Sequence, residues 1–234
     1  MINLKSYTYL LLRVDLFRRR FQREEIDRSL ILKFLGGRGL GAKILFDELK
    51  PSTQPLAADN KLLFLTGPLI GTGAPWSVKY TAMTKSPLSG TILMSLAGGF
   101  FGPHLRFAGY DGLIIEGRAE EPSYLWINEG KAELKRASHV WGMNTDDCQE
   151  AIRKELGDQG IQISCIGPAG EKGVRFACII SGRRAAGRGG AGAIMGSKNL
   201  KAIAVRGTPQ GSHRGIPEFP GTSEGDSEEG SPDR

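Results

Sequence analysis

The chain has 234 residues, 40% of them hydrophobic, which is enough for one large or two small domains with a buried core. Its longest apolar runs have the length of strands and are too short to span a membrane, and no secretory signal is evident, so we expect a cytoplasmic protein. Cys148, Cys165 and Cys178 lack metal-ligand spacing and the three histidines are scattered, so the sequence predicts no metal site made of protein ligands.

The net charge of +6 is distributed unevenly along the chain. From Pro209 onward six acidic and two basic residues give −4, which leaves +10 on residues 1–208. A basic body of this kind suits nucleic acid, an anionic cofactor or an acidic partner surface. The acidic segment consists of Gly, Ser, Pro and acids without apolar periodicity, so we expect one domain over residues 1–208 and a disordered tail over residues 209–234.

Apolar periodicity predicts that the first half alternates strands with short helices. Asp27 is the expected N-cap of a helix that ends before Gly36-Gly37, and Lys50-Pro51 ends the next helix. In chain order we expect a strand at 7–16, a second strand after a turn at 17–21, helices at 27–35 and 38–49, strands at 62–65 and 80–84, a helix at 103–107 and a strand at 112–117.

The second half begins with a predicted hairpin around Glu129-Gly130. An amphipathic helix follows, with Asn144 or Thr145 as its cap and Gly157 as its end. The expected elements are strands at 124–127 and 132–134, a helix at 144–156, a strand at 161–166, an apolar run of strand character at 176–180 and a strand at 202–205.

A weak internal repeat relates the two halves at an offset of 90 residues. Gly99-x-x-Gly102 aligns with Gly189-x-x-Gly192, and residues 112–117 align with residues 202–207. Each copy has a glycine cluster, a short helix and a strand that ends at glycine. We expect a duplication that brings two glycine-rich helix starts towards one ligand; chance similarity in a chain with 33 glycines is the alternative.

The second glycine cluster has the composition of an anion-binding segment. Residues 183–192 contain three arginines and four glycines, lie between two apolar runs and lead into a short helix. Glycine allows close backbone approach, a helix start carries partial positive charge, and arginine binds phosphate through two parallel hydrogen bonds. The pattern predicts an anion cradle, with a cofactor phosphate as the favoured anion. A flexible linker or a solvated turn is the alternative, which the flanking strands disfavour.

Five longer motifs occur along the chain: Lys85-Ser-Pro-Leu-Ser-Gly90, Gly98-Gly-Phe-Phe-Gly102, Phe107-Ala-Gly-Tyr-Asp-Gly112, Ile166-Gly-Pro-Ala-Gly170, and Arg184-Ala-Ala-Gly-Arg-Gly-Gly190 continued through Met195-Gly-Ser-Lys-Asn-Leu200. In this order, and without large gaps between them, they resemble the N-terminal domain of the aldehyde ferredoxin oxidoreductase family. The resemblance covers roughly residues 5–208.

The resemblance implies an α+β fold in which two similar β-sheets with short helices, related by a pseudo-two-fold axis, form the base of a pterin cofactor site. In that family the dithiolenes of two pyranopterins hold tungsten, or in some members molybdenum, and the enzyme also carries a four-iron four-sulfur cluster. It oxidises aldehydes to carboxylates and passes the electrons to ferredoxin. A metal held by pterin sulfur is consistent with the scattered cysteines and histidines of this sequence.

Carried over by position, the family's cofactor contacts fall at Lys79, Gly98, Arg184, Ala185 and Gly187. The chain departs from the family pattern in two places. Lys79 replaces an arginine and keeps the charge without the bidentate fork, and Leu96 replaces an asparagine and loses a side-chain hydrogen bond. The resemblance assigns no catalytic residue and no metal ligand to this chain.

Family members continue into two helical domains that carry the cluster cysteines, the acid–base residues and the substrate pocket, and this sequence lacks them. We therefore expect the cofactor-binding part of a tungsten-dependent oxidoreductase, truncated or split and inactive alone, which needs a separate chain with the helical domains. The alternative is a non-catalytic module that binds an anion or a partner. Nucleic-acid binding ranks last, because residues 183–192 lack aromatic side chains that stack on bases. The cofactor face should expose Phe100, Phe101 and Met195 and so promote self-association.

Overall fold

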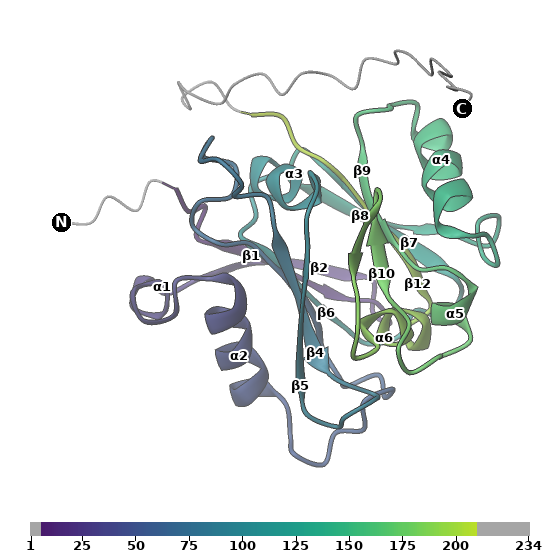
Figure 1. Ribbon diagram of the computed structural model, residues 1–234, viewed down its shortest axis with the longest axis horizontal. Helices are drawn as coiled ribbons and strands as arrows, with labels where there is room; N and C mark the ends of the chain where they lie inside the picture. The colour runs from purple at the N-terminus through teal and green to yellow at the C-terminus, as the bar shows by residue number, and fades with distance from the viewer. Residues whose placement is uncertain (1–5, 210–234) are drawn as a thin grey trace, which may run out of the picture.

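The strands bury side chains on both of their faces. The computed structural model describes residues 6–209 (Figure 1). The predicted tail, residues 209–234, lies outside the described residues except for Pro209. In β6 (Gly112–Glu116), Leu113 and Ile115 belong to one hydrophobic cluster and Ile114 belongs to another. Successive side chains of a strand point to opposite faces, so both faces of this sheet are covered.

The described strands form two mixed six-stranded sheets. In spatial order the first sheet contains β2 (Arg20–Glu25), β1 (Leu10–Asp15), β6, β3 (Leu62–Leu65), β4 (Tyr80–Lys85) and β5 (Ile92–Ala97). The second sheet contains β8 (Lys131–Arg136), β7 (Ser123–Asn128), β12 (Leu200–Arg206), β9 (Gln162–Cys165), β10 (Ile179–Ser181) and β11 (Arg184–Ala186).

The two sheets share one topology. Each strand of the first sheet has a counterpart six strands later in the chain, at the same place in the second sheet. In each sheet the strand that comes first in the chain pairs in parallel with the strand that comes sixth, β1 with β6 and β7 with β12. All the other neighbouring strands are antiparallel. The predicted α+β fold with two similar sheets is confirmed. The repeat is confirmed too, because residues 101–107 and 191–197 form equivalent helices at the offset of 90.

The inner faces of the two sheets pack against each other and form the main core. Leu113 from the first sheet and Leu125 from the second are fully buried members of this cluster. On the outer faces, α1 (Arg28–Phe34) and α2 (Gly37–Glu48) cover the first sheet, and α4 (Thr145–Leu156) covers the second (Figure 1). The architecture is a stack of helix, sheet, sheet and helix, in which each helical layer closes one smaller core.

Local signals set the ends of the outer helices. Asp27 caps α1 and accepts a hydrogen bond from the Ser29 amide at 2.6 Å, as predicted. Asn144 caps α4 and accepts from the amides of Asp146 and Asp147 at 3.0 and 2.9 Å. Gly157 ends α4 in the left-handed conformation, with φ of 71°.

Three shorter helices lie between strands: α3 (Phe101–Phe107), α5 (Pro168–Glu171) and α6 (Ala191–Ser197). The sequence did not predict α5, because Gly167-Pro168 reads as a turn; here the proline starts a single helical turn. The strand predicted at 176–180 begins only at Ile179, because the Ala177 amide donates to Val174 O in a turn.

The prediction of an exposed face made of Phe100, Phe101 and Met195 is wrong for two of its three residues. Phe101 and Met195 are fully buried in the main core, because α3 and α6 turn these side chains towards the space between the sheets. Phe100 is 41% exposed.

Candidate functional site

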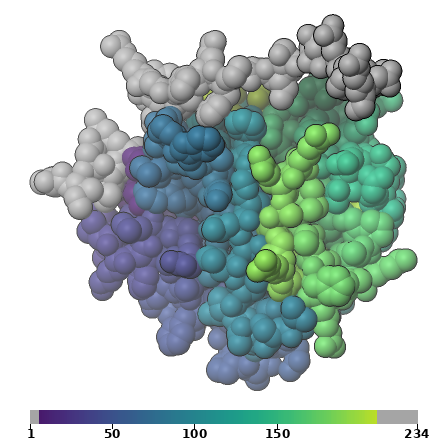
Figure 2. Space-filling model, viewed as in Figure 1, coloured from purple at the N-terminus to yellow at the C-terminus, as the bar shows by residue number. Residues whose placement is uncertain are grey.

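The last strands of the two sheets meet on one face of the molecule. β5 and β11 are edge strands, and they run side by side down the middle of this face (Figures 1 and 2). Two serine hydroxyls join the halves beside these strands. Ser95 Oγ of β5 donates to the O atom of Gly187, directly after β11, at 2.6 Å, and Ser86 Oγ, directly after β4, donates to Gly189 O at 2.7 Å. Both halves of the chain therefore build this edge. Sequence analysis did not single out either serine, because no local pattern marks a hydroxyl that bonds across the duplication.

Two glycines at the end of β5 lie beside an arginine of the other half. Gly98 and Gly99 follow β5, and Arg184 begins β11. Arg184 Cγ lies 3.8 Å from the position that a Cβ atom would take at either glycine. Gly99 has φ of 89°, which favours glycine at this position. The structure thus brings together Gly98 and Arg184, two predicted site residues from different halves.

The β10–β11 hairpin presents two more of the predicted residues. Ile180 pairs with Ala185, and Gly182 has φ of 56° in the turn between the strands. Arg184 and Ala185 are exposed, whereas Ala186 is buried in the core. Gly187 follows directly and is the residue that Ser95 holds. Ala185 and Gly187 therefore lie at the same edge as Arg184.

Lys79 completes the predicted set from the opposite side of β5. It directly precedes Tyr80, which pairs with Ala97 next to Gly98. Lys79, Arg183, Arg184 and Arg188 are all exposed, and within residues 6–209 none of them forms an ion pair. The five residues predicted to contact a cofactor thus lie around one junction of strands. The cations at this junction form no ion pair with a carboxylate among the described residues.

The sequence around this junction is free of acids. Residues 61–110 hold four lysines and arginines, residues 172–209 hold eight, and neither segment contains Asp or Glu. Unneutralised cations attract anions, and exposed arginines offer the fork that binds phosphate. The absence of acidic residues from these two segments can be read from the sequence, but the net charge of residues 1–208 does not reveal it.

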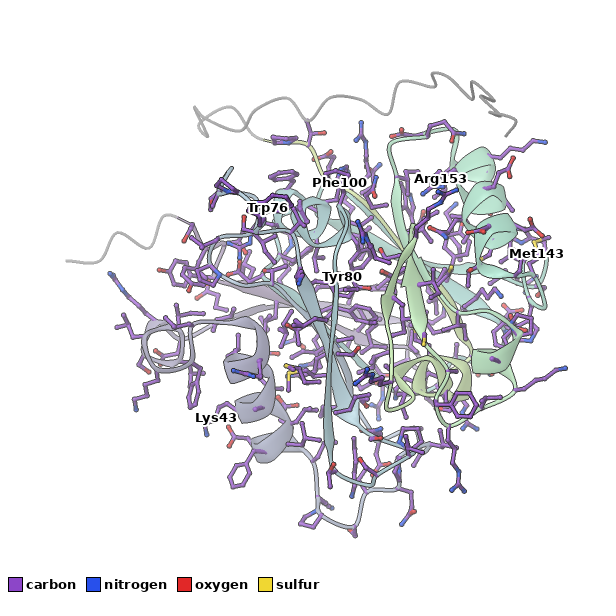
Figure 3. The ribbon with its side chains drawn as sticks, in the orientation of Figure 1. Lys43, Trp76, Tyr80, Phe100, Met143 and Arg153 are labelled. Atoms are coloured by element: carbon purple, nitrogen blue, oxygen red, sulfur yellow. The ribbon has the colours of Figure 1, made fainter. Side chains whose placement is uncertain are left out.

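Rigid packing supports the junction from behind. The hydroxyls of Tyr80 and Ser164 are 3.1 Å apart and buried, and they join the two sheets. Burial raises the pKa of Tyr80 to about 12, so this hydroxyl stays protonated at neutral pH. The Tyr80 ring lies at the centre of the molecule (Figure 3), with ring centroids 5.8 Å from Phe64 and 4.9 Å from Phe101. This packing fixes the start of β4 and hence the position of Lys79.

The later glycines do not form the open cradle that the sequence predicts. A Cβ atom at Gly189 would lie 2.3 Å from Leu93 Cδ1, and one at Gly190 would lie 2.1 Å from Arg175 O. The Gly192 amide donates to Ala177 O at 3.0 Å, and the start of α6 is buried. These glycines allow segments of the protein to pack closely. The open part of the site is the earlier group around Gly98 and Arg184.

The fold is a base of two duplicated sheets, and on one face, where their last strands meet, it presents glycines and cations that form no ion pair within residues 6–209. The family model described as the N-terminal domain of aldehyde ferredoxin oxidoreductase matches residues 11–207. The chain belongs to this family.

Relatives with different activities share this domain. The tungsten-containing aldehyde ferredoxin oxidoreductase of Pyrococcus furiosus is 50% identical over 198 residues, which are 84% of this chain and 33% of that protein. The aliphatic sulfonate oxidoreductase, WOR-like subunit, of the same organism is 40% identical over 219 residues, which are 87% of this chain and 35% of that protein. The chain spans about a third of the length of these curated relatives.

A solved structure shows the same fold. The active site complex BamBC of benzoyl coenzyme A reductase, in complex with 1,5-dienoyl-CoA, superimposes with a TM-score of 0.86 at 41% sequence identity and covers 87% of this chain and 31% of that chain. Within the part of this chain that the structure describes, none of the helices is both long and apolar enough to span a bilayer.

Proposed function

We propose that this chain binds the two-pterin metal cofactor of a tungsten- or molybdenum-dependent oxidoreductase. The cofactor would supply the redox chemistry, and this chain would hold its anionic groups. In the whole enzyme we expect aldehydes to be oxidised to carboxylates and electrons to pass to ferredoxin by way of a four-iron four-sulfur cluster. The observation that carries the proposal is the junction of Gly98 with Arg184 at a strand edge where, among residues 6–209, the exposed cations form no ion pair.

The donor set fits phosphate-bearing pterins. The aliphatic part of Arg184 lies beside Gly98 and Gly99. Its exposed guanidinium forms no ion pair among the described residues, so it would offer a bidentate bond to phosphate. Lys79 adds a second cation at the end of β5. The small residues Ala185 and Gly187 allow a flat ring system to approach the backbone closely. These residues would bind and orient the cofactor.

The two departures from the family pattern adjust this fit. Lys79 supplies a point charge where a guanidinium would supply two parallel donors. Leu96 is 47% exposed on β5 and offers no hydrogen bond. We expect Lys79→Arg and Leu96→Asn to raise the fraction of chains that retain the cofactor, because each adds a donor or acceptor at the edge.

Substrate specificity would be determined by another part of the enzyme. The relatives are named for an aldehyde and an aliphatic sulfonate, and the solved complex for benzoyl coenzyme A, yet all resemble this chain at 40–50% identity. A domain that varies so little across different substrates fits a role in holding a common cofactor.

The test is retention of the cofactor. The chain would be produced in a host supplied with tungstate, together with the polypeptide that carries the remaining domains, and analysed for tungsten, phosphorus and pterin. We expect all three in the purified protein, with a large loss in the Lys79→Ala/Arg184→Ala double variant. Arg28→Ala is the matched control, since Arg28 is an exposed arginine on α1 that forms no ion pair among the described residues.

Equal retention in the double variant and the control would contradict the site. Absence of metal and pterin from the wild-type complex would contradict the cofactor proposal as a whole. It would leave the alternative, a non-catalytic module whose basic edge binds another anion or a partner.

A further inference from the structure

The two halves expose an aromatic side chain at equivalent positions. Gly67-Pro68 follows β3 and Gly167-Pro168 follows β9, so the β3–β4 and β9–β10 connections correspond at an offset of 100 residues. At this offset Trp76 corresponds to Phe176. Trp76 is 95% exposed and Phe176 is 67% exposed. The duplication has thus placed a large aromatic group in solvent at the same point of each half.

Trp76 is held in an unfavourable state in this chain. Its φ of 63° lies in the left-handed region, which bulky residues rarely occupy. Such a conformation persists where the surrounding structure imposes it, and it is frequent at binding sites. The exposed indole adds a second cost, because its apolar surface remains in water. A partner that buries the indole would offset both costs, and tryptophan is prominent among the residues that contribute most to protein interfaces.

Hydrogen bonds fix both connections before any partner binds. Ser77 Oγ donates to Leu69 O at 2.9 Å and to Ala74 O at 2.6 Å, which closes the loop that carries Trp76. On the other half, the amides of Ala177 and Val174 donate to Val174 O at 2.8 Å and Ala169 O at 2.9 Å, respectively. A preformed anchor loses little conformational freedom when it binds.

Each aromatic residue has exposed cations near it in the sequence. Lys79 follows Trp76 by three residues, and Lys172 and Arg175 lie close to Phe176 in sequence. All three are exposed, and within the described residues none of them forms an ion pair. The complementary surface is therefore a pair of apolar sockets with carboxylates at their rims.

The two connections lie on opposite sides of the candidate cofactor site. In Figure 1 the β3–β4 connection is at the upper left and the β9–β10 connection at the lower right, with β5 and the β10–β11 hairpin between them. Figure 3 places Trp76 at the same end of the molecule as Phe100. A polypeptide that covered the site from one side to the other would meet both aromatic side chains.

We propose that Trp76 and Phe176 are the two anchors on which the remainder of the enzyme docks, through apolar sockets rimmed by carboxylates. The docking partner is the polypeptide equivalent to the remaining two thirds of the curated relatives, of which this chain spans 33%. This inference rests on the proposed function, because it assigns the surface that closes the cofactor site. Its content is separate, since it concerns contacts between polypeptides and not contacts with the cofactor.

The experiment compares the free chain with a chimera in which it replaces the 198 matched residues of the Pyrococcus furiosus relative. Hydroxyl-radical footprinting with mass spectrometry reports the oxidation rate of each aromatic side chain in both proteins. We expect the rates of Trp76 and Phe176 to fall several-fold in the chimera, in its metal-free as well as its loaded form. Phe17 is the matched control: it is an aromatic residue 64% exposed in the β1–β2 turn, and its rate should not change.

A second measurement uses the Trp76→Ser/Phe176→Ser variant. It should leave the melting temperature of the free chain unchanged or slightly raised, because both side chains are exposed there and serine tolerates the left-handed backbone of position 76 better than tryptophan. It should lower the melting temperature of the chimera. Oxidation of both residues at the free-chain rate in the chimera would overturn the inference, and so would protection that arises only after cofactor loading. Cofactor content, measured on the same samples, separates the two proposals. A loaded chimera with unprotected aromatics refutes docking alone, and a protected chimera that never binds cofactor refutes the proposed function alone.

Discussion

The two halves of the chain have the same topology but different buried charges. At the offset of 90, Asp111 in the first half corresponds to Lys201 in the second, and both are buried. Asp111 pairs with Arg106 at 3.0 Å and accepts from the amides of Thr8 and Tyr9. Lys201 pairs with Glu171 and donates to Met143 O at 2.9 Å. The duplicated fold therefore fixes the apolar pattern and leaves the sign of a buried charge free, provided that the charge is paired.

The same asymmetry extends to the candidate site. The first half supplies the open glycines and one cation, Lys79, whereas the second half supplies Arg183, Arg184 and Arg188. Two equivalent units of one ligand would thus meet equivalent backbones and different side chains. One half of the chain can therefore serve as the control for the other.

The largest expected effect comes from removal of one buried charge in either half. Asp111→Leu would leave the Arg106 guanidinium buried without its carboxylate partner. Lys201→Met would leave the Glu171 carboxylate buried without its ammonium partner. We expect each to lower the free energy of unfolding by about 3–5 kcal/mol, measured by urea denaturation. Arg106→Met/Asp111→Leu should cost less than Asp111→Leu alone, because it removes both charges. A loss below about 1 kcal/mol in either single variant would show that its pair is not buried in solution.

The next effect depends on pH and is confined to the first half. Burial, with a smaller contribution from the nearby charge of Arg206, lowers the pKa of His104 to about 4, and Nδ1 has no hydrogen-bond partner among the described residues. The pKa in the unfolded chain is about 6.5, so between these values the unfolded state binds more protons and stability falls as the pH falls. The full difference amounts to about 3 kcal/mol at pH 4 relative to pH 7.

The second half provides the control for this histidine. The residue equivalent to His104 at the offset of 90 is Ile194, which is fully buried. His104→Ile should therefore abolish most of the loss of stability between pH 7 and pH 4, and it should leave the free energy of unfolding at pH 7 unchanged or higher. Urea unfolding of the wild type and the variant from pH 4 to pH 7 measures the free energy of unfolding of each protein. Parallel curves for wild type and variant would contradict the lowered pKa.

A smaller effect distinguishes two aligned glycines. A Cβ atom at Gly192 would lie 2.5 Å from Cys178 O, whereas one at Gly102 would lie 3.3 Å from Tyr80 Cβ and 3.5 Å from Val78 O. Backbone cannot yield as a flexible side chain does, so Gly192→Ala should cost about 1–3 kcal/mol and Gly102→Ala clearly less. Thermal unfolding of the two variants tests the order. Equal losses would mean that the two helices pack with equal tolerance, against the observed geometry.

These contrasts show what sequence could and could not predict. Strands and caps followed from local signals such as Leu62–Leu65, Asp27 and Gly157, and the repeat predicted the duplicated fold. Side-chain direction in short helices did not follow: Phe101 and Phe100 are neighbours of similar hydrophobicity, and only the position of α3 between the sheets decides which of them is buried.

The site was predicted in part for the same reason. Gly98 and Gly192 look alike in sequence, since both belong to glycine clusters next to a short helix. One faces an arginine side chain at 3.8 Å and the other a backbone carbonyl at 2.5 Å. Whether a glycine admits a ligand or another segment of the protein depends on the partner segment, and that partner lies in the other half or in a distant turn. Motif resemblance selected Lys79, Gly98, Arg184, Ala185 and Gly187, whereas glycine and arginine content favoured the whole of residues 183–192.

The smallest expected effects concern the helix caps, and they separate the two halves by pH. Asn144→Ala removes the acceptor for two amides of α4 and should cost about 1 kcal/mol at any pH, because an amide side chain does not titrate. Asp27→Ala removes the acceptor for one amide of α1 and should cost less. Its hydrogen bond to the Ser29 amide lowers the pKa of Asp27, so this contribution is present at neutral pH and is lost as the pH falls through the acidic range. Denaturation at pH 7 and pH 3 should therefore show the Asn144→Ala deficit at both values and the Asp27→Ala deficit only at pH 7. A persistent Asp27→Ala deficit at pH 3 would mean that the protonated side chain, or its contact alone, is enough to hold the start of α1.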